Sequence, residues 1–250
     1  MGPDLSIIIP TIRIESWEPL IESIADSCWR NSHEIIFVGP SYNNYIDKFK
    51  NIKYARDFGS PNRCQQIGMT LAEGEYVTWG SDDCLYEPHA IDECLNIARE
   101  NDECIIVTNY DEGGNVAVED FSINHCYPSC PAIADEWVIF NTAFMQRDVF
   151  ESLGGFDCSF DVTCVGHADL AARCQFAGHN VIVHNIKLLQ CLHMPATTGD
   201  HAPIHYAQLQ KDIPNYIAKF NAPSFPIENV KSSNWKEQPP VWKRRFNETT

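Results

Sequence analysis

Two patterns of apolar residues alternate along the first half of the chain. Short continuous apolar runs, typical of strands covered on both faces, occur at 5–10, 34–39, 52–55, 76–80 and 104–108. Between these runs, apolar residues recur every three or four positions, as Ile21, Ile24 and Cys28 do after Pro19. Strands that alternate with amphipathic helices predict βαβ units and an α/β fold with a mainly parallel sheet flanked by helices.

The second half of the chain has a less regular pattern. Residues 111–131 contain glycines and prolines without periodicity, which indicates a loop. The pattern then predicts ordered structure at 137–144, helices at 147–153 and about 168–177, and a strand at 180–184. Gly178 follows the second helix at the position that accepts a positive φ.

The size and composition are those of one globular domain followed by a different kind of segment. The chain has 250 residues, of which 44% are hydrophobic and 21% are charged. Residues 221–250 form a Pro-rich, basic and irregular C-terminal extension, and we assign residues 1–220 to the domain. Trp235 and Trp242 predict that parts of the extension dock on that domain, because free linkers rarely carry large aromatic residues.

The charge of the chain disfavours nucleic acid as a partner. Asp and Glu number 34 against 18 Lys and Arg, which gives a formal net charge of -16. No apolar stretch is long enough for a membrane span, and no signal peptide is recognised. The basic cluster Lys243–Arg245 is most simply a solvated tail, with peripheral contact to an anionic membrane as the alternative.

The cysteines indicate a reducing compartment. There are eleven, an odd number, and no CxxC pair occurs, which fits neither a disulfide framework nor a structural zinc site. Most are expected to be buried as small hydrophobic residues, as at Cys28, Cys64, Cys94 and Cys174. The expected location is therefore cytoplasmic.

The candidate chemistry lies directly after the predicted strands. In an open parallel sheet, ligands bind outside the carboxyl ends of the strands. Asp82 and Asp83 follow the fourth strand, and adjacent carboxylates offer hard oxygen ligands for Mg²⁺ or Mn²⁺ and, through the metal, for a diphosphate. The alternative is a solvated acidic turn, a common feature of α/β proteins.

Five sequence landmarks over residues 5–190 resemble the family-2 type of GT-A glycosyltransferase. They are Leu5-Ser-Ile-Ile-Ile-Pro-Thr11, Glu34-Ile-Ile-Phe-Val-Gly39, Gly74-Glu-Tyr-Val-Thr-Trp-Gly-Ser-Asp-Asp83, the segment from Phe144 to Asp157 that contains Gly154-Gly155-Phe156, and Gly166-His-Ala-Asp-Leu-Ala-Ala-Arg173. The resemblance implies a GT-A (Rossmann-like) fold, with a nucleotide-sugar half over about 1–110 and an acceptor half over about 111–220. It also implies transfer of a sugar from a nucleotide-diphosphate donor, most often a UDP-sugar, to a hydroxyl acceptor such as a glycan or a lipid-linked compound.

The resemblance implies a metal-dependent donor site that departs from the family pattern. The Asp-x-Asp motif maps to Gly80-Ser81-Asp82, so its first aspartate is absent, and no carboxylate follows the second strand at Gly39-Pro40-Ser41. Mn²⁺ or Mg²⁺ would be held by Asp82 and Asp83, with His193 as a further ligand or simply a packed or solvated histidine. The implied donor-binding residues are Pro10, Thr11, Glu15, Ser41, Arg63, Ser81 and Asp82.

The resemblance also implies a general base for inverting transfer. The family's Glu-Asp pair maps to Gly166 and His167, and Asp169 is the nearest carboxylate. Both candidates are predicted in the first turn of a helix, and Asp169 is favoured because a carboxylate also stabilises the positive charge on the sugar ring. Trp137 is the candidate acceptor platform, with core packing as the alternative.

Three other functions compete with this interpretation. The missing motif residues would suit a catalytically silent nucleotide- or glycan-binding protein on the same fold. A nucleotidyltransferase shares a related sheet, but the Gly154-Gly155-Phe156-Asp157 landmark argues against it. A DNA-modifying glycosyltransferase is disfavoured by the negative charge.

Overall fold

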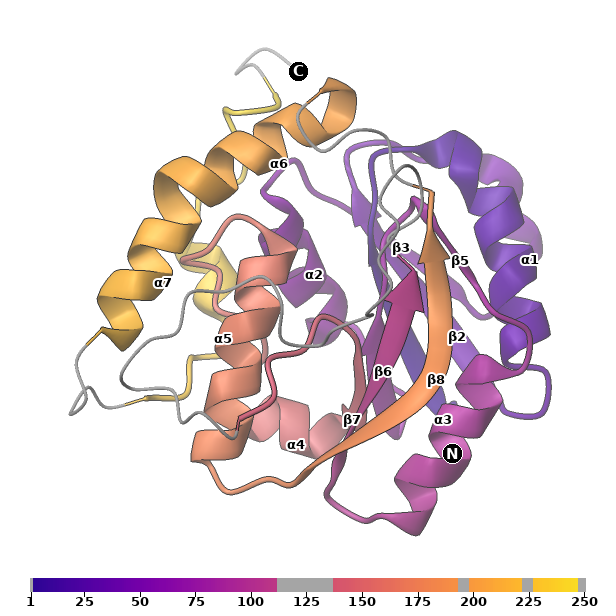
Figure 1. Ribbon diagram of the computed structural model, residues 1–250. Helices are drawn as coiled ribbons and strands as arrows, with labels where there is room; N and C mark the ends of the chain where they lie inside the picture. The colour runs from indigo at the N-terminus through magenta and orange to yellow at the C-terminus, as the bar shows by residue number, and fades with distance from the viewer. Residues whose placement is uncertain (1, 112–136, 193–197, 222–226, 247–250) are drawn as a thin grey trace.

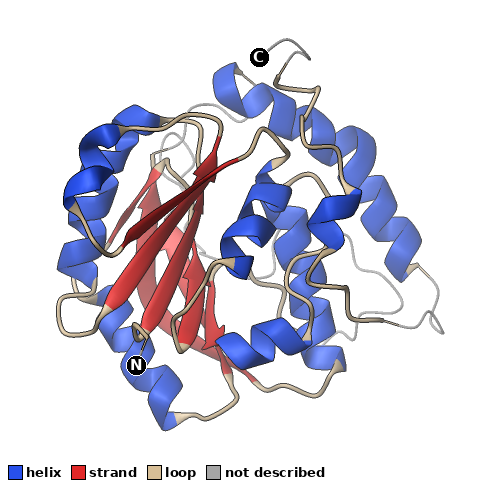
Figure 2. Cartoon of the chain, turned by 180° about the vertical axis from the view of Figure 1, so that it is seen from behind, coloured by secondary structure: helices blue, strands red, loops and turns tan. Residues whose placement is uncertain are grey.

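Eight strands form one sheet with helices on both faces (Figures 1 and 2). The computed structural model describes residues 2–111, 137–192, 198–221 and 227–246. The strand order is β3-β2-β1-β4-β7-β6-β8-β5. The strands are β1 (Leu5–Pro10), β2 (His33–Gly39), β3 (Ile52–Arg56), β4 (Tyr76–Trp79), β5 (Cys84–Tyr86), β6 (Ile105–Asp111), β7 (Ala143–Gln146) and β8 (Val181–Cys191).

The sheet is mostly parallel, which confirms the predicted α/β class. Strands β1 to β4 form a parallel half, and β6 pairs parallel with β8. Strand β7 lies antiparallel between β4 and β6, and β5 is antiparallel to β8 at the edge. The central strands have a continuous apolar sequence because helices cover both of their faces.

The two faces of the sheet carry separate hydrophobic clusters. Ile7 and Ile9 pack in the cluster of α1 (Trp17–Ser27) and α3 (Ala90–Glu100). Ile8 packs in the cluster of α2 (Pro61–Thr70), α4 (Arg147–Ser152) and α5 (Thr163–Phe176). Successive side chains of a strand point to opposite faces, so the alternation within β1 divides the core into two layers.

A long helical segment that the periodicity does not predict lies beside α5 (Figure 1). It consists of α6 (Ala202–Ala207), a π-helical turn η4 (Gln208–Asp212) and α7 (Ile213–Phe220). Pro203 is the second residue of α6, in the first turn of the segment, where a missing N–H costs little. Pro214 is the second residue of α7, the helix that directly follows the π-helical turn. The remaining elements are the 3-10 turns η1 (Ile14–Ser16), η2 (Asn44–Lys48), η3 (Gly199–His201) and η5 (Asn234–Glu237).

Helix α5 begins one turn earlier than predicted, so His167 and Asp169 do not lie in its first turn. The residue before the helix, Val162, offers no side-chain cap. Instead, the carboxylate of Asp212 accepts hydrogen bonds from the backbone N–H groups of Asp161 and Val162. The turn that leads into α5 is thus held by a carboxylate from η4, so the local sequence gives no signal for the start of the helix.

Other boundaries also differ from the prediction. The segment predicted as ordered over 137–144 is irregular up to residue 142, and the strand there is β7. Strand β8 continues to Cys191 instead of ending at 184, because it pairs along β6 and then with β5. Most of the predicted loop at 111–131 lies outside the described residues.

The C-terminal extension docks on the domain, as Trp235 and Trp242 suggest. Trp242 is 7% exposed, and its indole N–H donates to Asp161 Oδ2 at 3.0 Å. Val241 forms a β-bridge with Phe58, and Trp235 packs against the core cluster of α2 and α5. The described part of the extension, 227–246, contains only the short turn η5 as helix, in agreement with its predicted irregularity.

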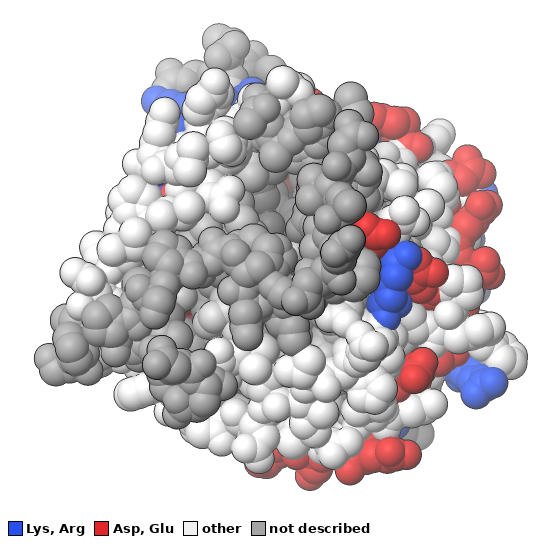
Figure 3. Space-filling view, viewed as in Figure 1, with Lys and Arg blue, Asp and Glu red and all other residues white. Residues whose placement is uncertain are grey.

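Cys28, Cys64, Cys94 and Cys174 are buried and free. Figure 3 shows acidic side chains along the edge of the molecule near α1 and α3, where Glu18, Glu22 and Glu93 are exposed. Among the described residues, no helix has the length and hydropathy needed to cross a membrane.

Candidate functional site

A cavity of about 560 Å³ lies at the carboxyl ends of β1 and β4. Thr11 and Ser81 line it from the loops that follow these strands, and His167 lines it from α5. His201 and Arg245 reach it from η3 and from the C-terminal extension. The volume is within the range of small-molecule sites, and the position is the one expected for a ligand of an open α/β sheet.

Asp82 holds the loop after β1. Its Oδ2 accepts hydrogen bonds from the backbone N–H groups of Ile12 and Arg13, both at 2.6 Å, and from Thr11 Oγ1 at 3.0 Å. Its Oδ1 accepts from Arg13 Nη1 at 2.7 Å. Burial raises the pKa of Asp82, against the opposing effect of Arg13. The carboxylate, 3% exposed, therefore fixes both the backbone and the side chain of Arg13.

Asp83 meets a histidine that is distant in the sequence. Its Oδ2 lies 3.0 Å from His201 Nε2 and 3.7 Å from Arg13 Nη1, and its Oδ1 accepts from Ser81 Oγ. Both Asp83 and His201 line the cavity. The structure thus brings a histidine from beyond the sheet to the acidic pair, but this histidine is His201. The predicted ligand His193 lies outside the described residues.

Two arginines that line the cavity, Arg13 and Arg245, both contact Asp200. Arg13 Nε lies 3.3 Å from Asp200 Oδ2, and Arg245 Nη2 donates to the backbone carbonyl of Asp200. Burial and the charge of Arg13 lower the pKa of Arg245. Burial would also lower the pKa of Arg13, but Asp82, Asp83 and Asp200 raise it. Neither arginine is among the predicted site residues. The position of Arg13 directly after the first strand is a signal that could have found it, whereas nothing local distinguishes Arg245 from its basic neighbours.

His167 lies at the cavity in an aromatic environment. Its ring centroid is 5.3 Å from that of Trp79 and 5.4 Å from that of Phe156, and its Nε2 lies 2.9 Å from Gln65 Oε1. Burial lowers the pKa of His167 to about 3. The imidazole is therefore neutral at neutral pH and can accept or donate a hydrogen bond without carrying charge.

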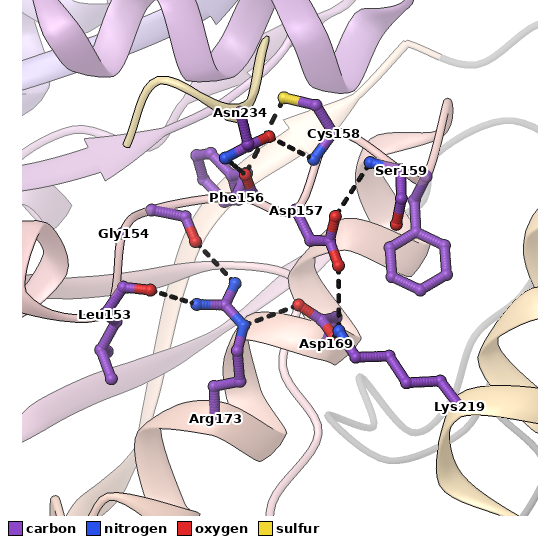
Figure 4. Close-up of polar contacts among 12 residues, drawn as sticks. Leu153, Gly154, Phe156, Asp157, Cys158, Ser159, Asp169, Arg173, Lys219 and Asn234 are labelled. Atoms are coloured by element: carbon purple, nitrogen blue, oxygen red, sulfur yellow. Dashed lines mark hydrogen bonds and ion pairs between the residues drawn. The ribbon is translucent and has the colours of Figure 1, made fainter. Parts of the chain in front are cut away.

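Asp169 does not line the cavity and belongs to a buried charged cluster (Figure 4). Its side chain is fully buried, with Oδ2 2.7 Å from Arg173 Nε and Oδ1 bonded to Lys219 Nζ. Lys219 also pairs with Asp157 Oδ2 at 2.9 Å. Burial would lower the pKa of Lys219, but the two carboxylates raise it, so the ammonium stays charged.

The other predicted site residues divide between the cavity and the rest of the molecule. Pro10, Thr11 and Ser81 line the cavity, whereas Glu15, Ser41, Arg63 and Trp137 do not. Arg63 is buried, pairs with Asp57 at 2.9 Å and donates to the carbonyl of Trp235, which anchors the C-terminal extension. Trp137 packs against the core cluster of α2 and α5, as its alternative interpretation expects.

Two side chains at the cavity, those of Asp83 and His201, could hold a divalent cation together with a ligand. The described ranges contain no group of three or more His, Cys, Asp or Glu side chains placed to hold a metal. The Asp83 carboxylate and the His201 imidazole nevertheless face each other at the cavity, and a carboxylate is a ligand type that suits Mn²⁺ and Mg²⁺. Such ions commonly take one or two protein ligands and complete their coordination with substrate phosphates and water.

The fold is similar to that of solved glycosyltransferase structures. No protein-family model matches the chain, and a search of curated proteins gave no match. S. aureus TarS 1–349 matches with a TM-score of 0.59 and 12% identity over 76% of this chain. Over this region the chain has a fold similar to that of TarS. It covers 60% of the length of that structure.

Two further TarS structures contain ligands. TarS 1–349 in complex with UDP matches with a TM-score of 0.57 and 14% identity, over 87% of this chain and 70% of that one. The complex with UDP-GlcNAc matches with a TM-score of 0.59 and 13% identity, over 94% and 70% of the two chains. At these identities the likeness to TarS establishes the fold.

Proposed function

We propose that the protein is a glycosyltransferase that moves a sugar from a nucleotide-diphosphate donor, most simply a UDP-sugar, to a hydroxyl acceptor. The observation that carries this proposal is the cavity at the carboxyl ends of β1 and β4, in a fold shared with a protein solved with UDP and UDP-GlcNAc. We assign residues 1–220 to the transferase domain, with the donor half over about 1–110. The buried free cysteines support a reducing location such as the cytoplasm.

The donor would be held by the loops after β1 and β4. Pro10, Thr11 and Ser81 face the cavity, and Asp82 keeps the first loop in place through the backbone of Ile12 and Arg13. Asp82 also fixes the guanidinium of Arg13, which lies beside both Asp82 and Asp83. Asp82 thus acts on the donor site through its hold on the β1 loop.

A divalent cation, Mn²⁺ or Mg²⁺, would be held by Asp83 and His201. When bound, it would supply charge neutralisation for the leaving diphosphate. Asp82 is less available as a ligand than Asp83, because three donors already engage its Oδ2 and Arg13 engages its Oδ1.

The acceptor hydroxyl would meet His167 in preference to Asp169. His167 lines the cavity and is neutral, and its low pKa of about 3 suits it to position the acceptor rather than to remove its proton. Asp169 is enclosed by Arg173 and Lys219 and holds α5, the helix that carries His167. Inverting transfer is part of the proposal. The first acceptors to test are the hydroxyl groups of glycans and of lipid-linked compounds.

A ligand screen by thermal unfolding tests the donor class. The purified protein is melted with UDP, GDP and CMP and with their common sugar conjugates, each with and without Mn²⁺. A ligand that binds only the folded state raises Tm, so we expect a rise with UDP and UDP-sugars that increases with Mn²⁺. An unchanged Tm with every nucleotide would contradict the proposal.

A second candidate is a catalytically silent nucleotide- or glycan-binding protein. Gly80 stands where the resemblance places an aspartate, and the Asp82 carboxylate is already engaged by the protein. Donor turnover separates the two functions. A silent protein would show the Tm rise with nucleotide, but it would neither hydrolyse the UDP-sugar nor transfer its sugar.

A further inference from the structure

We propose that the C-terminal extension completes the donor site, with Arg245 and Arg13 together binding the diphosphate of the nucleotide. This inference rests on the proposed function and adds residues that lie far outside the sequence landmarks. Both side chains line the same cavity, one from the loop after β1 and the other from the end of the described chain.

The two guanidiniums are brought together by one residue. Arg13 contacts the carboxylate of Asp200, and Arg245 contacts its backbone carbonyl. Asp200 is largely exposed, and its neighbour His201 contacts Asp83. Arg13, Arg245 and His201, which all line the cavity, are therefore linked through Asp200 and its neighbour.

Arg245 is the cation at this wall that favours an anion. Arg13 is already paired with carboxylates, whereas the contact of Arg245 with Asp200 is to a backbone carbonyl. Burial and the charge of Arg13 lower the pKa of Arg245, although Asp200 and Asp82 oppose this shift. An oxyanion beside Arg245 would supply a counterion. Guanidinium groups bind phosphate oxygens in a bidentate manner, so a diphosphate is the matching ligand.

The extension is anchored firmly enough to place Arg245 before the ligand arrives. Trp242 is held by Asp161 and lies beside Arg245, whose guanidinium is 5.4 Å from the indole ring. The backbone N–H of Trp242 donates to the carbonyl of Phe58 at 2.8 Å. Farther back along the extension, Arg63 bonds to the carbonyl of Trp235. A residue that is already in position costs less conformational entropy on binding.

The neighbouring Lys243 provides a matched control. It carries the same charge two positions earlier, but it is exposed and does not line the cavity. A general attraction between the basic tail and a nucleotide would depend on both residues. A specific site would depend on Arg245 alone.

Calorimetric titration of the full chain with UDP and with inorganic pyrophosphate tests the inference. Wild type, Arg245→Ala, Arg245→Lys and Lys243→Ala are compared, each with EDTA and with Mn²⁺. We expect Arg245→Ala to weaken both ligands by about tenfold or more, the loss typical of a charge-assisted hydrogen bond. Arg245→Lys should weaken both ligands less, and Lys243→Ala should match wild type.

The outcomes separate this inference from the proposed function. The proposed role of Arg245 would be overturned if Arg245→Ala bound both ligands with wild-type affinity. It would also be overturned if Arg245→Ala and Lys243→Ala lost affinity equally. Pyrophosphate binding that depends on Arg245, without UDP binding or sugar transfer, would support the anion site and overturn the glycosyltransferase. Melting of each variant without ligand checks the fold, and Arg245→Lys replaces Arg245→Ala in the comparison if the latter unfolds.

Discussion

At the residue scale, His167 shows how the fold changes the chemistry of a side chain. A histidine in water titrates near neutral pH, but burial among Trp79 and Phe156 lowers the pKa of His167 to about 3. Between about pH 6.5 and pH 3, the His167 imidazole therefore binds a proton in the unfolded chain but not in the folded protein. His167 should consequently make the folded protein less stable as the pH falls.

We predict that replacing His167 by Gln flattens the pH dependence of stability. The unfolded chain binds a proton as pH falls below about 6.5, whereas the folded protein does so only near pH 3. The contribution of His167 to the free energy of unfolding is therefore fully present above the pKa of the unfolded chain. It is lost as the pH falls below that value, by about 1.4 kcal/mol per pH unit. Urea unfolding at several pH values between 7 and 5 measures this. Equal pH slopes in the variant and wild type would refute it.

The adjacent carboxylates should give different phenotypes. We predict that Asp83→Asn removes the enhancement of UDP binding by Mn²⁺, because an amide is a poorer metal ligand and Asp83 faces His201. Asp82→Asn should weaken UDP binding equally with Mn²⁺ and with EDTA, because it disturbs the hold on the β1 loop. Calorimetry under both conditions distinguishes them. Retained Mn²⁺ enhancement in Asp83→Asn would remove Asp83 from the metal site.

At the element scale, the charged cluster of Figure 4 joins α5 to α7 and to the turn after α4. Asp169 pairs with Arg173 on its own helix and with Lys219 on α7. Arg173 also donates to the carbonyls of Leu153 and Gly155. In that turn Gly154 has φ +80, and an added Cβ would lie 1.6 Å from the carbonyl oxygen of Val230. The double glycine therefore allows the extension to pass close to the turn.

We predict that Asp169→Asn lowers the free energy of unfolding by about 3 kcal/mol or more, because it leaves the buried Arg173 without its carboxylate and Lys219 with Asp157 alone. Nucleotide affinity in the folded protein should stay within twofold of wild type, since Asp169 does not line the cavity. Chemical denaturation and calorimetry provide the two measurements. Asp148→Asn, an exposed carboxylate on α4, is the control. Unchanged stability with lost transfer would return Asp169 to the role of general base.

At the scale of the whole molecule, the cavity wall is assembled from segments at both ends of the chain. Residues from β1, α5, η3 and the C-terminal extension meet around it. Many of the exposed carboxylates lie elsewhere, along the edge near α1 and α3 (Figure 3). Anions are therefore disfavoured over much of the surface, and the arginines at the cavity provide a local exception.

We predict that Trp242→Ala detaches the end of the extension and weakens UDP binding. The substitution removes the hydrogen bond to Asp161 and a buried aromatic ring. Hydrogen exchange should become faster over 240–246, and UDP affinity should fall about as much as in Arg245→Ala. Exposed Trp29 offers the control substitution, Trp29→Ala. Unchanged exchange over 240–246 would show that Trp242 does not hold the extension.

The sequence by itself determined the parallel half of the sheet, its helices α1 and α3, and the buried cysteines. These features depend on local periodicity, and a strand such as β1 that is apolar at nearly every position has few alternatives to a covered central strand. The same pattern located the polar residues after β1 and β4, because strand ends in a parallel sheet share one edge.

Only the tertiary structure decided what these polar residues do. Asp82 and Asp83 are neighbours in sequence, but one holds the β1 loop and the other meets His201, 118 residues away. Asp169 was placed in a buried charged cluster by Lys219, and Arg245 was brought to the cavity by the anchoring of Trp242. A carboxylate or guanidinium takes its role from the charges and burial around it, and these come from segments that no local pattern connects.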